Sequence, residues 1–154
     1  MHHVVLGTSY KAEVFEEYFG DGSEFGLEIE YVVEEEALGT GGAIRNVADK
    51  LRYDNAMVFN GDVLSGADLS AILGTHVEHD ADVTLHLVRV PDPRAFGSVP
   101  TDKDGNVQAF LEKTEDPPTD QINAGCYVFK RSVIEQIPAG RVVSVERETF
   151  PGLP

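Results

Sequence analysis

Strand and helix patterns alternate through residues 1–90, and this alternation constrains the fold more than any other feature of the sequence. Short apolar or alternating runs predict strands at residues 4–6, 27–33, 56–59 and 83–90, and apolar residues at helical spacing predict helices at 12–19, 44–51 and 69–76. A helix between two strands returns the chain to the same end of the sheet, so the strands run parallel. The pattern therefore predicts an α/β domain with a parallel sheet and helices on both faces.

The pattern changes at Pro91-Asp92-Pro93. A turn at Asp104-Gly105-Asn106 follows, which indicates a hairpin-rich lobe. The later elements are expected to be short strands near 97–99 and 107–112, a strand at 122–129, a helix at 133–137 and an irregular end at 140–154. No internal repeat or linker divides the 154 residues, so we expect one domain.

An excess of acidic residues excludes two classes of partner. The sequence holds 27 acidic and 12 basic residues, a formal net charge of -15. Nucleic acid and anionic membranes bind clustered Lys and Arg, so we expect neither as a partner. A phosphate ligand would depend on local backbone N–H groups, a few placed cations and a metal ion.

Cysteine content and the first residues bear on the compartment. Cys126 is the single cysteine, which rules out an intrachain disulfide and a cysteine metal cluster and fits a reducing cytoplasm. The apolar run Val4-Val5-Leu6 ends at Gly7, too short for a signal peptide or a membrane span. We therefore expect a cytoplasmic protein.

Two loops follow predicted strands, at the sheet edge where open α/β domains bind ligands. Gly39-Thr40-Gly41-Gly42 opens a helix, so its N–H groups could hold a base edge or an anion, or the glycines could simply form a tight turn. Asp62 follows Asn60-Gly61 after an apolar strand. A carboxylate there could bind Mg²⁺ on a triphosphate, or serve as an ordinary turn residue.

Three segments of the second half could contact a sugar phosphate. Glu112-Lys113 closes a strand and projects a carboxylate and an ammonium, which could equally form a surface ion pair. Asn123-Ala124-Gly125 opens the next strand, where the amide could bind sugar hydroxyls and the glycine leave room for a ring. Phe96-Gly97 could border the same sugar or form the mouth of a hairpin.

The order and spacing of these segments resemble those of the sugar-1-phosphate nucleotidylyltransferases. The nearest members of the family are mannose-1-phosphate guanylyltransferases of actinobacterial type. The resemblance covers nearly the whole chain and is carried by Glu36-Ala37-Leu38-Gly39-Thr40-Gly41-Gly42, Phe59-Asn60-Gly61-Asp62, Phe96-Gly97, Glu112-Lys113, Asn123-Ala124-Gly125 and the segment from Ser144 to Pro151.

This resemblance implies a Rossmann-like αβα nucleotidyltransferase domain with a mixed sheet. The implied reaction joins a nucleoside triphosphate, GTP by the nearest members, to a sugar 1-phosphate such as mannose 1-phosphate, with Mg²⁺ as cofactor. Residues 1–90 would bind the nucleotide and residues 91–154 the sugar. By the same resemblance the nucleotide would be bound by Glu36, Leu38, Gly39, Thr40, Gly41, Gly42, Asn60 and Gly61, the metal by Asp62, the sugar phosphate by Lys113, and the sugar by Phe96, Gly97, Glu112, Asn123 and Gly125.

The sequence departs from the family pattern at two places. Members begin with a strand and a glycine-rich loop that supplies a catalytic Arg and a Lys, and neither is found here. Members also carry a second metal-binding aspartate on a later strand, which this sequence does not contain. We therefore expect a domain lacking the first strand, with open sheet edges that favour homo-oligomers and with little or no activity alone. A non-catalytic module that binds a nucleotide sugar or regulates a partner stays open as an alternative. A dehydrogenase is disfavoured, because Gly7-Thr8-Ser9 lacks the dinucleotide fingerprint.

Overall fold

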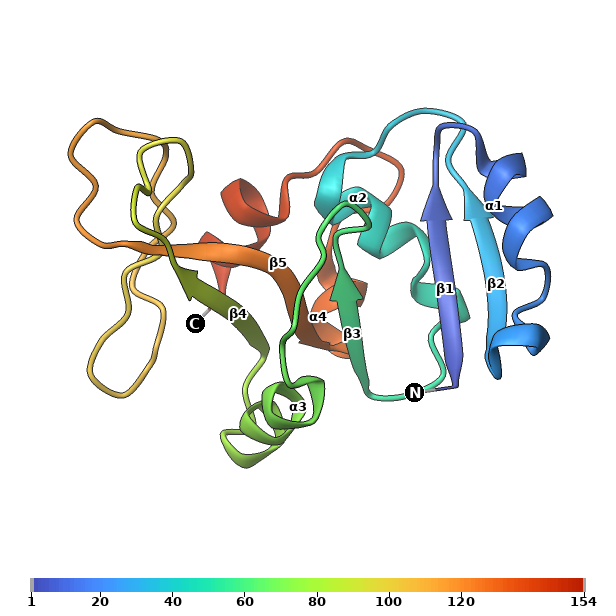
Figure 1. Ribbon diagram of the computed structural model, residues 1–154, viewed down its shortest axis with the longest axis horizontal. Coiled ribbons are helices and arrows are strands. Elements are labelled where there is room, and N and C mark those ends of the chain that lie inside the picture. Colours follow the sequence, from blue (N-terminus) through green and yellow to red (C-terminus); the bar gives the residue numbers. More distant parts are fainter. Residues whose placement is uncertain (1, 154) are drawn as a thin grey trace.

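The computed structural model describes residues 2–153 and contains every strand and helix expected within residues 1–90 (Figure 1). The strands are β1 His3–Thr8, β2 Glu28–Val33, β3 Asn55–Phe59, β4 Val83–Arg89 and β5 Gln121–Lys130. The α-helices are α1 Ala12–Phe19, α2 Gly39–Asn46, α3 Leu69–Glu78 and α4 Arg131–Gln136. Short 3-10 turns at Ser23–Phe25, Ala48–Lys50 and Phe150–Gly152 and a π-helical turn at Val145–Thr149 complete the secondary structure.

The strands form two sheets. β1 and β2 pair in parallel, whereas β5 lies between β3 and β4 and runs antiparallel to both. The expectation of parallel pairing within residues 1–90 is therefore confirmed for β1 and β2 and wrong for β3 and β4, each of which pairs with the antiparallel β5. The reason is that β4 leads into the lobe rather than into a crossover helix, so the chain returns in the opposite direction as β5. The mixed α/β architecture agrees with the one implied by the resemblance.

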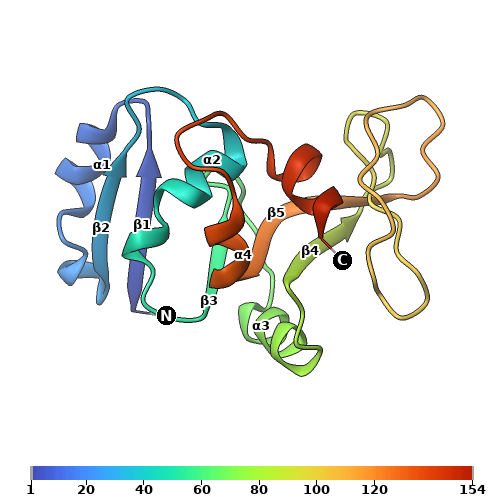
Figure 2. The same ribbon diagram turned by 180° about the vertical axis from the view of Figure 1, so that it is seen from behind.

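β1 and β3 are neighbours in space but belong to different sheets. Both views show the two strands side by side and pointing the same way, with β2 and α1 beyond β1 (Figures 1 and 2). β1 pairs with β2 and β3 pairs with β5, so the edges that β1 and β3 turn toward each other carry no strand pairing in the described part of the chain.

Helices cover both faces of the β3–β5–β4 sheet. On one face, α2 and α4 bury a core with Ala56 and Phe129 of the sheet (Figure 2), and Ile134 of α4 and Phe129 have no exposed surface. The ring of Phe150 stacks on that of Phe129, with 5.9 Å between the ring centroids. Burial of each such large side chain contributes about 1.5–3 kcal/mol. This core anchors the segment after α4 against the sheet.

The other face is covered by α3, which is held by a buried histidine. His76 is 1% exposed, and its ring nitrogens lie 2.9 Å from Thr84 Oγ1 of β4 and 3.3 Å from Asn55 Oδ1 of β3. A buried imidazole needs such partners, because an unpaired polar group in the core costs about 1–3 kcal/mol. One side chain thus ties the helix to two strands of the sheet.

The second half of the chain differs from its expected structure in two places. The short strands of the lobe are isolated bridges only, Ser98 with Leu111 and Thr101 with Val107 among them. Residues 140–154 were expected to be irregular, but Val145–Thr149 forms a helical turn, and the N–H of Arg147 in that turn donates to Ser144 Oγ over 3.3 Å. Capping by a serine side chain is a local signal that the sequence contains and that the apolar periodicity does not reveal.

None of the helices within residues 2–153 has the length and apolarity needed to cross a membrane.

Candidate active site

A cavity of about 640 Å³ lies where the lobe meets the first residues of β5 and the turn Val145–Thr149. Five residues named from the sequence line it, namely Phe96, Gly97, Glu112, Lys113 and Asn123. They come from segments up to 27 positions apart, and the fold brings them to a single concave surface. Apolar walls with a few convergent polar groups are typical of small-molecule sites.

Gly97 allows two of these segments to approach each other. A Cβ atom at this position would lie 2.8 Å from the carbonyl oxygen of Leu111, and the N–H of Ser98 donates to the same oxygen over 3.0 Å. Any side chain at position 97 would push the backbone of Leu111 away. The close pairing places Glu112 and Lys113 beside Phe96, which explains a glycine at the mouth of the hairpin.

The amide of Asn123 is held on every side. Its Nδ2 group donates to the hydroxyl of Tyr127 and, over 2.7 Å, to Oε1 of Glu146, while its Oδ1 accepts the N–H of Gly125 at 3.0 Å. Burial raises the pKa of the Tyr127 hydroxyl. The bonds fix which end of the amide faces Gly125 and which faces Glu146.

Gly125 connects this cavity to the loop that carries Asp62. Its φ is +68°, and a Cβ atom would lie 2.9 Å from the side-chain nitrogen of Asn60. The carbonyl of Gly125 accepts the N–H of Asn60 at 2.8 Å. Gly125 does not line the cavity itself. Instead, Gly125 is the residue through which strand β5, which carries Asn123, contacts the segment Asn60-Gly61-Asp62.

Asp62 is an exposed carboxylate just beyond the end of β3. Residues 2–153 contain no group of three His, Cys, Asp or Glu side chains arranged to hold a metal ion. Mg²⁺ in phosphate-transfer sites is commonly held by one or two carboxylates together with the phosphates of the substrate. A single hard oxygen ligand next to Gly61, which has open space around it, fits that mode and does not fit a preformed protein cage.

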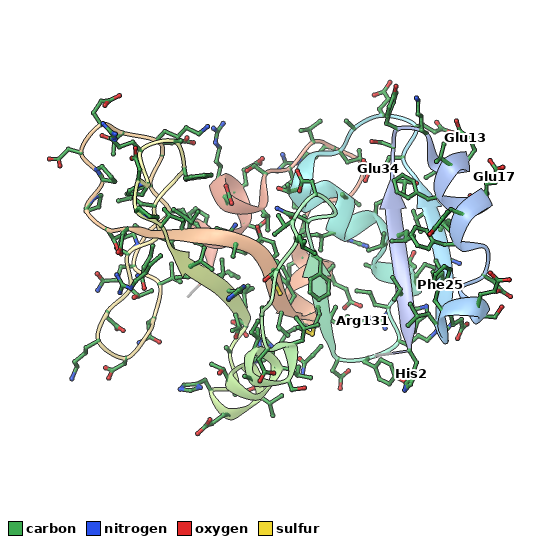
Figure 3. The ribbon with its side chains drawn as sticks, in the orientation of Figure 1. His2, Glu13, Glu17, Phe25, Glu34 and Arg131 are labelled. Carbon is green, nitrogen blue, oxygen red and sulfur yellow. The ribbon has the colours of Figure 1, made fainter. Side chains whose placement is uncertain are left out.

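The loop Leu38–Gly42 begins α2 rather than preceding it. Its N–H groups are partly used. That of Leu38 donates to Glu34, whose side chain is labelled in Figure 3, and those of Gly41 and Gly42 donate to the carbonyl of Val143. Gly41 and Gly42 are buried, whereas Gly39 and Thr40 are exposed. The first N–H groups of a helix have no partner within the helix. Those of Gly39 and Thr40 are therefore the ones of this loop that can meet a ligand, and Glu36 is an exposed side chain just before them.

The segment from Arg141 to Arg147 joins this loop to the cavity. The N–H of Val145 donates to Thr40 Oγ1 at 3.0 Å, so the segment touches the loop at one end. At the other end Glu146 and Arg147 line the cavity, where Arg147 pairs with Glu112 at 2.7 Å. The sequence analysis gave no role to these two residues. Their place in the segment Ser144–Pro151, which carries part of the family resemblance, is the sequence signal that could have identified them.

The fold and the grouping of carboxylate, ammonium and amide groups in one cavity define the class. The chain belongs to the nucleotidyl transferase family, whose sequence model matches residues 1–150.

Particular relatives agree with this class. The mannose-1-phosphate guanylyltransferase of Mycobacterium tuberculosis is 72% identical over 153 residues, which are 99% of this chain and 43% of that protein. The D-glycero-alpha-D-manno-heptose 1-phosphate guanylyltransferase of Aneurinibacillus thermoaerophilus is 38% identical over 132 residues, 86% of this chain and 56% of that protein. This chain thus spans about half the length of either relative.

A solved structure matches the fold over the whole chain. The crystal structure of HddC from Yersinia pseudotuberculosis superposes with a TM-score of 0.87 at 28% identity, covering 100% of this chain and 67% of that one. The overall fold of this chain therefore corresponds to one observed in a solved structure.

Proposed function

We propose that this chain takes part in guanylyl transfer from GTP to mannose 1-phosphate, giving GDP-mannose and pyrophosphate. The relative of 72% identity is named for this reaction, and that identity extends over nearly all of the present chain. The second relative is also named as a guanylyltransferase, which supports guanine as the base.

The observation that carries the proposal is the cavity that contains Glu112, Lys113 and Asn123, together with its link to the Asp62 loop through Gly125 and Asn60. In the proposed roles, Lys113 binds the phosphate of mannose 1-phosphate, and Glu112 and Asn123 bind sugar hydroxyls. Phe96, Gly97 and Gly125 shape the sugar site. Residues 91–154 thus serve mainly the sugar and residues 1–90 mainly the nucleotide.

Nucleotide binding is assigned to the loop around α2 and to the end of β3. The N–H groups of the exposed residues Gly39 and Thr40 would face the base edge, with Glu36 and Leu38 beside them. The buried residues Gly41 and Gly42 would hold the turn through their hydrogen bonds to the carbonyl of Val143. Asn60 and Gly61 would let the phosphates approach, and Asp62 would hold Mg²⁺. The metal, when bound, neutralises charge on the triphosphate.

The chemistry needs positioning rather than a covalent intermediate. A phosphate oxygen of the sugar attacks the α-phosphorus of GTP, the bond from that phosphorus to the bridging oxygen of the β-phosphate breaks, and pyrophosphate leaves with both electrons of that bond. The chain carries a net charge of -15, so its overall field opposes two anionic substrates. Local cations such as Lys113 must therefore supply the attraction.

The strand edges and the single cysteine bear on the assembly and the setting of the chain. The open edges of β1 and β3 support self-association, because unpaired strand edges accept another strand. We also infer a reducing cytoplasm as the setting, because the single cysteine, Cys126, is buried and has no second cysteine in the chain with which to form a disulfide.

Calorimetric titration of the chain with GDP-mannose, with and without Mg²⁺, tests the function, and dTDP-glucose serves as the control ligand. We expect GDP-mannose to bind and dTDP-glucose to bind more weakly or not at all. Equal binding of the two would contradict the assignment of guanine and mannose. A folded chain that binds neither would contradict the proposed sites.

A further inference from the structure

Two consecutive residues, Glu146 and Arg147, contact Asn123 and Glu112, the side chains that bind the sugar in the proposed function. Glu146 accepts a hydrogen bond from Asn123 at 2.7 Å, and Arg147 pairs with Glu112 at 2.7 Å. Both reach into the cavity from the turn Val145–Thr149. A sugar that binds Asn123 and Glu112 must therefore compete with, or rearrange, both contacts.

The contact of Arg147 is one that a ligand can readily exchange. The side chains of Arg147 and Glu112 are 73% and 69% exposed, and an ion pair so open to solvent contributes little to stability. The turn that carries Arg147 is fixed, because Ser144 caps it and Phe150 at its end is buried in the core. The guanidinium can thus change partner while its backbone stays in place.

The charges in the cavity also favour an exchange. Its lining contains two carboxylates, Glu112 and Glu146, and two cations, Lys113 and Arg147. A sugar monophosphate brings a charge of about −1.5 to −2 at neutral pH. Lys113 alone would leave much of that charge uncompensated in a strongly acidic protein. Arginine suits the remaining role, since its planar fork matches the geometry of a phosphate.

We propose that Arg147 is a second phosphate-binding residue of the sugar site, held on Glu112 when the site is empty and transferred to the phosphate of the incoming sugar 1-phosphate. The exchange frees the carboxylate of Glu112 for the sugar hydroxyls at the moment when the phosphate arrives. This inference rests on the proposed function, since it takes mannose 1-phosphate as the ligand.

The test is the affinity of the chain for mannose 1-phosphate, measured by calorimetry for Arg147→Gln and Arg147→Lys. Loss of one charge-assisted contact predicts binding about 10- to 100-fold weaker for Arg147→Gln, with partial recovery in Arg147→Lys. Arg52→Gln is the matched control. Arg52 is also exposed and paired with a glutamate, Glu28, but does not line the cavity, so its replacement should leave the affinity unchanged.

A second pair of variants separates phosphate binding from an indirect effect through Glu112. If Arg147 acts only by neutralising Glu112, then Arg147→Gln will have no effect in a chain that already carries Glu112→Gln. We expect it to weaken binding in that background as well, and the absence of any effect there would overturn the inference.

The outcomes also distinguish this inference from the proposed function. If the unaltered chain binds mannose 1-phosphate, Lys113→Gln weakens it and Arg147→Gln does not, the role of Arg147 is wrong and the sugar site stands. If the unaltered chain is folded and does not bind mannose 1-phosphate at all, both are wrong.

Discussion

The backbone N–H of Asn60 donates to the carbonyl of Gly125 at 2.8 Å, and the side chain of Asn60 lies against the place where a Cβ of residue 125 would be. This contact joins the end of β3, which leads to Asp62, to the strand that carries Asn123. The loop proposed to bind the metal and the cavity proposed to bind the sugar are therefore connected through a position that accepts only glycine without strain.

Gly125→Ala should destabilise the chain and disturb both segments. The added methyl would meet the Asn60 side chain at 2.9 Å and would force a residue with a side chain to adopt a φ of +68°. We expect a loss of about 1–3 kcal/mol in the free energy of unfolding, measured by urea denaturation. Gly66→Ala is the control, because Gly66 has open space around it and no positive φ. Equal stability of the two variants would show that the contact does not constrain position 125.

Thr40→Val should separate the loop Leu38–Gly42 from the cavity segment. It removes the hydroxyl that accepts the N–H of Val145, a residue that is 1% exposed, and leaves that donor buried without a partner. The expected cost is roughly 1–3 kcal/mol in the free energy of unfolding. Thr40→Ser keeps the hydroxyl and should retain most of the stability. If valine and serine behave alike in chemical denaturation, the hydrogen bond does not support the loop.

The sequence predicted the fold of residues 1–90 well, because hydrophobic periodicity reports directly on which faces of these elements are buried. The strand expected at 122–129 is present as β5, but its antiparallel direction was not predicted, since strand direction depends on the route of the lobe, and that route has no periodic signal. The residues of the candidate site were likewise predicted only in part. Glu112, Lys113 and Asn123 were assigned to the site through the resemblance to the family, since by residue type alone each also fitted an ordinary surface or turn position. Glu146 and Arg147 reach the cavity from a turn whose Val145 and Phe150 pack into a core formed by distant segments.

Stability should fall in mild acid because of His76. Burial, followed by the nearby charge of Lys130, lowers the pKa of this imidazole, while Asp80 and Asp82 act weakly in the opposite direction. The unfolded chain then binds the proton more readily than the folded one, so the contribution of His76 is complete above about pH 6.5 and is lost as the pH falls from there toward the folded-state pKa. His76→Gln should flatten this part of the curve of unfolding midpoint against pH. Identical curves for His76→Gln and the unaltered chain would contradict the role of His76.

Asp62→Asn should weaken Mg²⁺-dependent binding of GTP. The carboxylate is the ligand proposed for the metal, and loss of about 1.4 kcal/mol or more would reduce affinity at least about tenfold. Binding of mannose 1-phosphate in the absence of metal should be retained. Asp49→Asn, an exposed aspartate on the 3-10 turn after α2, is the control. Unchanged metal dependence of GTP binding in Asp62→Asn would remove Asp62 from the proposed site.

The most direct test of the account is a backbone NMR titration of the ¹⁵N-labelled chain with GDP-mannose, which reports on every N–H group at once. We predict that the largest shifts fall on residues 39–40, 60–62, 96–97, 112–113, 123–125 and 146–147, which surround the cavity and the two loops joined to it. Shifts confined to the second, smaller cavity lined by Asp54, Asp80 and Lys130, or spread evenly over the chain at saturation, would contradict the proposed sugar and nucleotide sites.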